Sequence, residues 1–396
     1  MCATSRAAGN ERTPLSPVAQ DGRLANLDVL RAAALLGVLL VNLLTEFRVS
    51  IFEQFFRSSD GSPTDRAVNR FVEIAVEFKA FVLFSFLFGV GLAIQFDRCE
   101  RAGRGFAGHV ARRFGSLLVI GLVHLTLIWN GDILTEYALA GFLALPLLSR
   151  RRSLLFVAVV LLIVFVAPIP YPEPFPSAEV MRAHIRLANR IYANGSYADV
   201  QAFRWRELPA MLALDLAVLP RTLSLFALGI WAWRAQVFAP HGRLPMLRWT
   251  AWLGLLGGGL ATLLSAGIFG EISLGAADAI ISDLAAIALA LGYGALLLLL
   301  YDRPGARRWL QLLAPLGRMA LSNYLMQSVI FGWIFYGYGL GCFATMSSTH
   351  AAILGIAVYG CQAALSHLWL QRYRFGPVEW LWRSATYAAW QPLRRR

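Results

Sequence analysis

The stretch LDVLRAAALLGVLLVN, from Leu27 to Asn42, is an apolar run that carries three costly polar side chains, Asp28, Arg31 and Asn42. An ionised side chain at the centre of a membrane helix costs about 2.5–3.5 kcal/mol, so such residues are usually retained for a partner or a task. Asp28 and Arg31 are three residues apart, on one helix face, where they are able to pair. We interpret the stretch as most of a membrane-spanning helix whose polar groups require an explanation.

The composition of the whole chain is that of a membrane protein. Of its 396 residues, 58% are hydrophobic and 15% are charged, whereas a soluble domain is about 25% charged. The apolar residues form runs near the length that crosses roughly 30 Å of hydrocarbon. The sequence therefore predicts an all-α, polytopic integral membrane protein with about ten transmembrane helices. The predicted spans are residues 27–46, 70–96, 113–130, 132–149, 153–169, 208–234, 247–269, 276–301, 317–338 and 350–371.

Arginine placement predicts the topology of these spans. If the N-terminus is cytoplasmic, the arginine-dense loops and both terminal segments fall on the cytoplasmic side, and short connections such as WNGDI on the other side carry no arginine. The long outer loop, residues 170–207, holds charges of both signs. This distribution follows the positive-inside rule. It predicts that both termini are cytoplasmic and that the chain is a multi-pass protein of the bacterial inner membrane. The net charge of +13 is spread over loops with no basic domain, so nucleic acid is not an expected partner.

The chain divides into three predicted regions. Residues 1–26 form a polar cytoplasmic arm, residues 27–372 form the transmembrane helical domain, and residues 373–396 form a tail whose Trp, Tyr and Arg residues are typical of a bilayer interface. The outer loop, residues 170–207, begins with PIPYPEPFP, which favours extended chain. It continues with SAEVMRAHIRLANRIY, whose spacing predicts a short amphipathic helix. The lipid bilayer is thus the first expected partner, and the sequence leaves open whether the protein forms an oligomer.

His124 and Asp132 are the candidate catalytic residues. They lie in GLVHLTLIWNGDILTEY, where one predicted span turns into the next through Trp129–Asp132. So tight a hairpin brings the two residues onto neighbouring antiparallel helices. Histidine is a general base near neutral pH, and a carboxylate orients its ring. The alternative, a histidine that only hydrogen-bonds a helix backbone or a neighbouring span, stays open.

Other polar residues have two possible roles. Lys79, in EIAVEFKAFVLFSFLFG, is a candidate substrate-binding residue, or it has a structural role in which it pairs with Glu77 or Glu73 or extends outward to the bilayer interface. Asn323 belongs to a polar stripe that either joins helices or lines a cavity. The other members of the stripe are Ser322, Tyr324 and Gln327.

Glycines and cysteines give two further indications. Gly89 and Gly91 predict a close helix contact. The cysteines share no metal-ligand spacing, so no metal site is predicted.

Five motifs resemble the YeiB-like family of membrane proteins called domain of unknown function 418. They are LDVLRAAALLGVLLVN, FLFGVGLAIQFDR, ARRFGSLLVIGLVHLTLIWNGDILTEYALAG, PLGRMALSNYLMQS and RFGPVEWLWR. The resemblance runs from Leu27 to Arg383, nearly the whole chain. One departure is Ala32, because the family usually shows a glycine after the first arginine.

The YeiB-like family is similar to two sets of transmembrane acyltransferases, the acyltransferase type 3 proteins and the heparan-glucosaminide N-acetyltransferases. The resemblance implies a membrane-bound acyltransferase with acyl-CoA as co-substrate, no tightly bound cofactor, and a carbohydrate or other acceptor at the periplasmic side. In the type 3 proteins a catalytic histidine follows an arginine by eleven residues, and here Asn42 follows Arg31 at that spacing. The heparan enzyme's histidine lies before its second span, and residues 47–79 contain none. Neither of these two catalytic histidines therefore has a counterpart in this chain.

The expected roles follow from these departures. Arg31 is expected to bind a phosphate or carboxylate of the donor at the cytoplasmic mouth. Asn42 is expected to orient a substrate or contribute to an oxyanion site, and His124 with Asp132 takes the place of the missing base. A transporter or lipid-handling protein is the alternative, although the absence of an obvious internal repeat weakens it. A non-catalytic membrane component, with the same residues as internal struts, is a further alternative.

Overall fold

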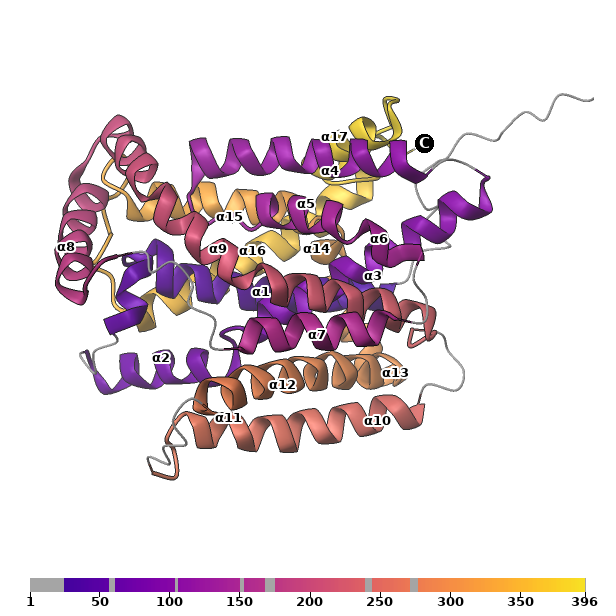
Figure 1. Ribbon diagram of the computed structural model, residues 1–396. Coiled ribbons are helices and arrows are strands. Elements are labelled where there is room, and N and C mark those ends of the chain that lie inside the picture. Colours follow the sequence, from indigo (N-terminus) through magenta and orange to yellow (C-terminus); the bar gives the residue numbers. More distant parts are fainter. Residues whose placement is uncertain are drawn as a thin grey trace, which may run out of the picture.

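The computed structural model describes residues 25–56, 61–103, 106–149, 153–167, 175–238, 244–270 and 277–395. Every secondary-structure element within those ranges is a helix, which confirms the all-α prediction. Five helices are long and apolar enough to cross a membrane, and Figure 1 shows them in one bundle. The chain is a helical membrane protein. The count of ten spans and the cytoplasmic placement of both termini stay predictions, and residues 1–24 of the predicted arm lie outside the described residues.

The helices follow one another along the chain with short connections. In order they are α1 (Ala25–Asn42), η2 (Leu43–Phe47), η3 (Ile51–Phe56), α2 (Pro63–Ala75), α3 (Lys79–Arg101), α4 (Phe106–Val123), η4 (His124–Ile128), α5 (Leu134–Leu143), α6 (Leu145–Ser149), α7 (Leu154–Val166), α8 (Ala178–Asn194), α9 (Tyr197–Arg234), α10 (Leu244–Trp252), η5 (Leu253–Gly258), α11 (Gly259–Ser265), α12 (Ala277–Tyr301), α13 (Pro304–Leu310), η6 (Gln311–Leu313), α14 (Ala314–Arg318), α15 (Ala320–Phe335), α16 (Ser348–Arg372) and α17 (Pro377–Tyr387). η2, η4 and η5 are π-helical turns, and η3 and η6 are 3-10 turns.

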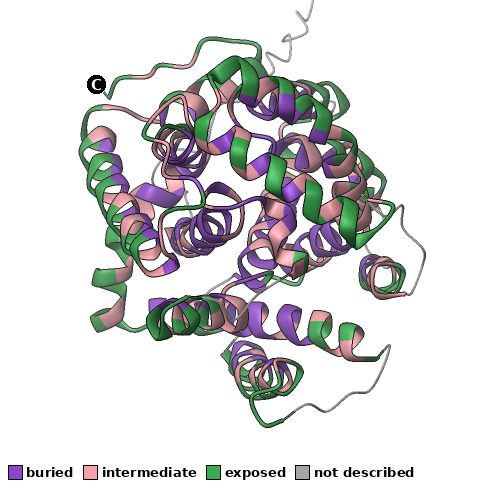
Figure 2. Cartoon of the chain, turned by 90° about the vertical axis from the view of Figure 1, so that its left-hand side faces the viewer, coloured by how far each residue is buried: buried purple, intermediate pink, exposed green. Residues whose placement is uncertain are grey.

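Helix α1 lies at the centre of the bundle (Figure 1). Its apolar window is 78% buried, whereas that of the helix Phe106–Ile128 is 22% buried. Contacts with α3, α14, α15 and α16 surround α1, and Figure 2 shows buried residues concentrated on the inner helices. The polar residues of α1 therefore face protein, which removes most of the cost of placing them in a membrane segment.

Two predicted boundaries are wrong. The span predicted at 70–96 is two helices, because Phe78 adopts a φ of 61° between α2 and α3 and interrupts the helical backbone. Within the loop predicted at 170–207, α8 confirms the amphipathic helix. The next helix, α9, then begins at Tyr197, inside the predicted loop, because Ser196 and Asp199 form a capping box there. α9 continues to Arg234 with two prolines in its interior.

Helices α3 and α9 touch backbone to backbone at two glycines. A Cβ on Gly89 would lie 2.3 Å from the Phe226 carbonyl oxygen, and one on Gly229 would lie 2.1 Å from the Phe86 carbonyl oxygen. Small residues permit such an approach between membrane helices. The predicted close contact is thus confirmed for Gly89 and wrong for Gly91, where an added Cβ would meet nothing within 4 Å.

We predict that Gly229→Ala lowers the free energy of unfolding by about 1–3 kcal/mol, because the new methyl group overlaps a backbone atom that cannot move independently. The matched control is Gly360→Ala on α16, where an added Cβ meets nothing within 4 Å. The free energy of unfolding of this control should equal that of the wild type or exceed it by up to about 1 kcal/mol, because alanine has the higher helix propensity. Thermal unfolding of the detergent-purified chain, followed by tryptophan fluorescence, measures both changes. Equal melting temperatures for the two variants would contradict the backbone contact.

Candidate functional site

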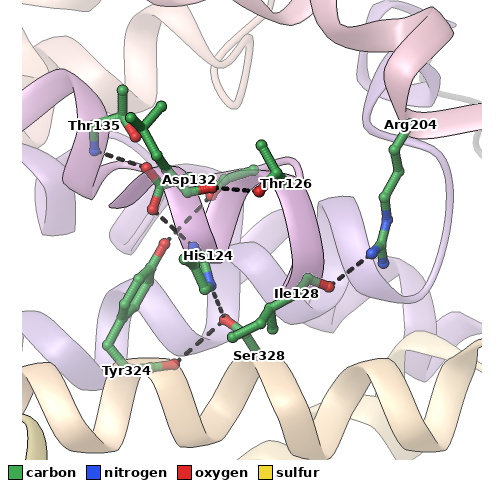
Figure 3. A network of polar contacts seen from close by, with 10 residues as sticks. His124, Thr126, Ile128, Asp132, Thr135, Arg204, Tyr324 and Ser328 are labelled. Carbon is green, nitrogen blue, oxygen red and sulfur yellow. Dashed lines mark hydrogen bonds and ion pairs between the residues drawn. The ribbon is translucent and has the colours of Figure 1, made fainter. Parts of the chain in front are cut away.

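His124, Asp132 and Ser328 form a chain of hydrogen bonds in the interior (Figure 3). His124 Nδ1 lies 2.7 Å from Asp132 Oδ1, and His124 Nε2 lies 2.9 Å from Ser328 Oγ. The other Asp132 oxygen accepts the backbone N–H of Thr135 at 2.7 Å. These contacts fit the tautomer in which Nδ1 donates to the carboxylate and Nε2 accepts from the serine hydroxyl. All three side chains are buried.

The local sequence explains how the hairpin positions this pair. α4 changes to the π-turn η4 at His124, the chain becomes extended at Trp129, and α5 begins at Leu134. Gly121 allows the start of α5 to approach α4, since a Cβ there would lie 2.7 Å from the Thr135 amide nitrogen. The structure thus brings His124 and Asp132 into direct contact across the turn. Single π-turns within helices are frequent at functional sites.

Asn42 also lies beside a π-turn. It is buried and is the last residue of α1 before η2, whereas His124 is the first residue of η4. η2 ends at Phe47, whose ring stacks on Trp129 with centroids 4.2 Å apart. The two π-turns therefore pack together through Phe47 and the residue that follows η4. Asn42 itself lines neither of the two cavities described below, so its expected role at a substrate stays a prediction.

A cavity of about 390 Å³ extends from a cluster of arginines to the neighbourhood of His124. Two of its lining residues lie close to the His124–Asp132 pair: Ile133, which follows Asp132 in the chain, and Tyr324, whose ring centroid lies 5.2 Å from that of His124. His124 does not line the cavity, so one layer of side chains separates the two. The apolar wall includes Leu35, Val38, Phe84, Phe88 and Leu117.

Five arginines from five helices line the same cavity, and we call them the arginine cluster. Arg31 pairs with Asp28 at 2.7 Å, as its spacing on α1 predicts. The Arg113 guanidinium lies 4.0 Å from the centroid of the Trp382 ring, and its buried Nε has no hydrogen-bond partner within the described residues. The five members are Arg31, Arg98, Arg113, Arg318 and Arg383.

One acidic side chain, Glu379 of α17, lines the cavity beside the arginine cluster. Its carboxylate accepts the N–H of Ser322 at 3.0 Å and the hydroxyl of Ser322 at 2.5 Å. Burial raises the pKa of Glu379 above its ordinary value, while these hydrogen bonds oppose the rise. The lining therefore carries an excess of positive charge in a mostly apolar enclosure, which is the arrangement that attracts an anion.

A second, much smaller cavity of about 10 Å³ lies on the other side of the α4–α5 turn. Glu207 of α9 lines it and accepts from Asn130 Nδ2 at 3.0 Å, from the Tyr192 hydroxyl and from His184 Nε2 at 2.8 Å. This volume holds about one water molecule. Carboxylates and aromatic rings dominate its lining, which includes Glu46, Trp129, Gly131, Tyr192, Glu207 and Tyr336.

Lys79 and Asn323 lie away from both cavities. Lys79 Nζ donates to the Glu73 carbonyl at 3.3 Å, at the junction of α2 and α3. Asn323 Nδ2 donates to the Leu316 carbonyl at 3.3 Å and to Ser366 Oγ at 3.0 Å, and so joins α14, α15 and α16. The polar stripe therefore has two roles: Asn323 joins helices, whereas Tyr324 lines the large cavity. Substrate binding by Lys79 and Asn323 stays a prediction.

The sequence reasoning missed Ser328 and most of the cavity wall. Ser328 directly follows Gln327, the last residue assigned to the polar stripe, so one further residue would have included it. Arg383 and Trp382 lie in the motif RFGPVEWLWR, which from sequence alone indicates an interfacial tail and a family motif and not part of a site. In the described ranges, no three His, Cys, Asp or Glu side chains are placed to hold a metal ion.

Comparison with known proteins identifies similar chains. The family model described as protein of unknown function (DUF418) matches residues 232–389. The chain is 34% identical over 406 residues to YxaH of Bacillus subtilis, covering 96% of this chain and 98% of YxaH. It is 26% identical over 392 residues to YeiB of Escherichia coli, covering 93% of this chain and 98% of YeiB. Both relatives are described as uncharacterized, so they supply a family and no activity.

We predict that His124→Ala destabilises the fold far more than Ser328→Ala. Without the imidazole, the buried Asp132 carboxylate loses its partner, at a cost of about 3–5 kcal/mol. Ser328→Ala removes one neutral hydrogen bond, at a cost of about 1–2 kcal/mol. Melting temperatures of the purified variants in one detergent measure the difference. Equal losses would contradict the role of His124 as the side-chain partner of the buried Asp132 carboxyl group.

Proposed function

We propose that this chain, which belongs to the YeiB-like DUF418 family of helical membrane proteins, is a membrane-bound acyltransferase of the bacterial inner membrane. It takes an acyl group from a cytoplasmic acyl-CoA and passes it to a hydroxyl or amine of a carbohydrate or other acceptor at the periplasmic side. One observation carries the proposal: a single cavity begins at the arginine cluster, has apolar walls, and ends at Tyr324 beside His124.

The cavity suits an amphipathic anion of the acyl-CoA type. Guanidinium groups bind phosphate oxygens through paired charge-assisted hydrogen bonds. The apolar wall accepts an alkyl chain, and each buried CH₂ contributes about 0.8 kcal/mol. Arginine-dense loops mark the cytoplasmic side by the positive-inside rule. α13, which carries Arg307 and Arg308, lies at the end of the bundle opposite α8 (Figure 1). In this proposal the donor enters beside the arginine cluster from the cytoplasm.

His124 and Asp132 supply the base that the reaction needs. Nε2 of His124 faces away from Asp132 and accepts a proton from a hydroxyl, as it accepts a hydrogen bond from Ser328 in the resting protein. Asp132 holds the other nitrogen protonated and stabilises the imidazolium that forms. General base catalysis of this kind contributes about 10²- to 10⁴-fold in rate.

A lipid-handling protein without acyl transfer is the second candidate. The observation in its favour is the same lining, because a lipid phosphate with its acyl chain also combines an anion with an apolar body. The two functions differ in bond breaking. Only the acyltransferase releases the free thiol of CoA, so thiol release separates them, whereas flux of lipid without thiol release would favour the second.

We predict that Arg113→Ala weakens binding of CoA by about 10- to 100-fold, which corresponds to one lost hydrogen bond to a charged group. The matched control is Arg308→Ala, an exposed arginine of α13 outside the cavity lining. Calorimetric titration of the full chain in lipid nanodiscs with CoA measures both affinities. If the two variants bind CoA equally, the arginine cluster is not the donor site.

We predict that His124→Gln lowers acyl-CoA-dependent thiol release by at least about 100-fold, because glutamine keeps a polar side chain but supplies no base. The measurement is thiol release by wild type and variant, each first shown to be monodisperse by gel filtration. The matched control is His367→Gln, because His367 is an exposed histidine of α16 outside both cavity linings. Full activity of His124→Gln would remove His124 from the mechanism.

A further inference from the structure

We infer that Ser328 is the nucleophile that carries the acyl group as an ester between donor and acceptor. This inference rests on the proposed acyltransferase function and adds a covalent intermediate to it. Its basis is the placement of Ser328, His124 and Asp132 in one line of hydrogen bonds next to residues of both cavities (Figure 3).

The geometry of Ser328 matches that of an activated nucleophile. Its hydroxyl lies 2.9 Å from His124 Nε2, whereas its contact with the Tyr324 carbonyl is 3.4 Å, beyond the usual range for a hydroxyl donor. The imidazole is therefore the primary acceptor of the hydroxyl proton. A nucleophile bonded to a base, which is itself oriented by a third group, is the recurring arrangement of covalent acyl transfer. The three groups come from α15, the π-turn η4 and the hairpin turn.

The hydrogen-bonded line lies next to residues of both cavities, although none of its three members lines either one. Ile133 and Tyr324 belong to the lining of the large cavity, and Trp129, Asn130 and Gly131 belong to that of the small one. The Tyr324 hydroxyl donates to the Gly131 carbonyl at 3.3 Å, so a single hydrogen bond joins the two linings.

Of the two cavities, the large one has room for a donor, whereas the small one holds about one water molecule. A nucleophile that keeps the acyl group as an ester lets the thiol leave before the acceptor occupies the same space, which favours a two-step transfer. Displacement of the Tyr324 ring is then the movement that admits the thioester to Ser328.

The chemistry balances in both steps. In the first, the Ser328 hydroxyl gives its proton to His124 Nε2 and its oxygen attacks the thioester carbonyl carbon; the C–S bond breaks, and the CoA thiolate leaves with that proton as a thiol. In the second, the acceptor hydroxyl or amine gives a proton to Nε2 and attacks the ester carbonyl; the bond to Ser328 breaks, and its oxygen recovers the proton. No oxidant or reductant is needed.

Two probes test the intermediate on the full chain in nanodiscs without an acceptor. Acetyl-CoA and palmitoyl-CoA report acylation, and an alkyl fluorophosphonate reports an activated serine whatever its donor. We expect a burst of about one thiol per chain and an adduct located on Ser328 by peptide mass spectrometry. Ser328→Ala should lose burst and adduct, whereas Ser366→Ala, a buried hydrogen-bonded serine of α16, should keep both. Ser328→Cys should convert the ester into a thioester that neutral hydroxylamine cleaves.

The outcomes separate this inference from the proposed function. Thiol release that persists in Ser328→Ala, with no adduct on Ser328 in the wild type, would overturn the covalent intermediate and leave acyl transfer by a direct route. A fluorophosphonate adduct on Ser328 without thiol release would support the activated serine and remove acyl-CoA as its donor. Absence of both thiol release and any adduct would overturn both proposals.

Discussion

The hydrogen bond between His124 and Asp132 is the interaction on which the interior arrangement depends. It joins the two arms of the α4–α5 hairpin through side-chain atoms 2.7 Å apart, and both side chains are fully buried. In such surroundings an unpaired carboxylate is strongly unfavourable, so the pair fixes the conformation of the turn. That conformation in turn places Trp129 against Phe47 of η2 and Gly131 beside the Tyr324 hydroxyl.

The arginine cluster depends on a different constraint, the central position of α1. Because α1 is surrounded by helices, Arg31 faces a cavity enclosed by protein instead of lipid. Arg113 and Arg383 reach that cavity from α4 and α17, which pack against each other through Trp382, whose indole N–H donates to the Arg113 carbonyl at 2.8 Å. The C-terminal segment thereby forms part of the wall. Positive charge so enclosed favours an anionic occupant with an apolar portion.

The site has two distinct parts, a cavity lined by the arginine cluster and a buried hydrogen-bonded line from Asp132 to Ser328. In the proposed function, the arginine cluster binds the donor by charge and the hydrogen-bonded line transfers the proton. Tyr324 and Ile133 line the cavity next to that line, and Ser328 is buried. The close packing of α3 on α9 at Gly89 and Gly229 holds the helices of the cavity wall in place.

The sequence by itself determined the helical membrane class, the resemblance to the YeiB-like family, the Asp28–Arg31 pair and the proximity of His124 to Asp132. Run length, charge placement and a short turn are local properties, readable from one chain. Only the tertiary structure decided that Ser328, 204 residues from His124, completes the hydrogen-bonded line. It also decided that Asn323 joins helices while its neighbour Tyr324 lines the large cavity, and that Lys79 lies outside both cavities. Adjacent helical residues differ by about 100° in direction, so their neighbours depend on which helices pack around them, and apolar lengths alone carry no information on that choice.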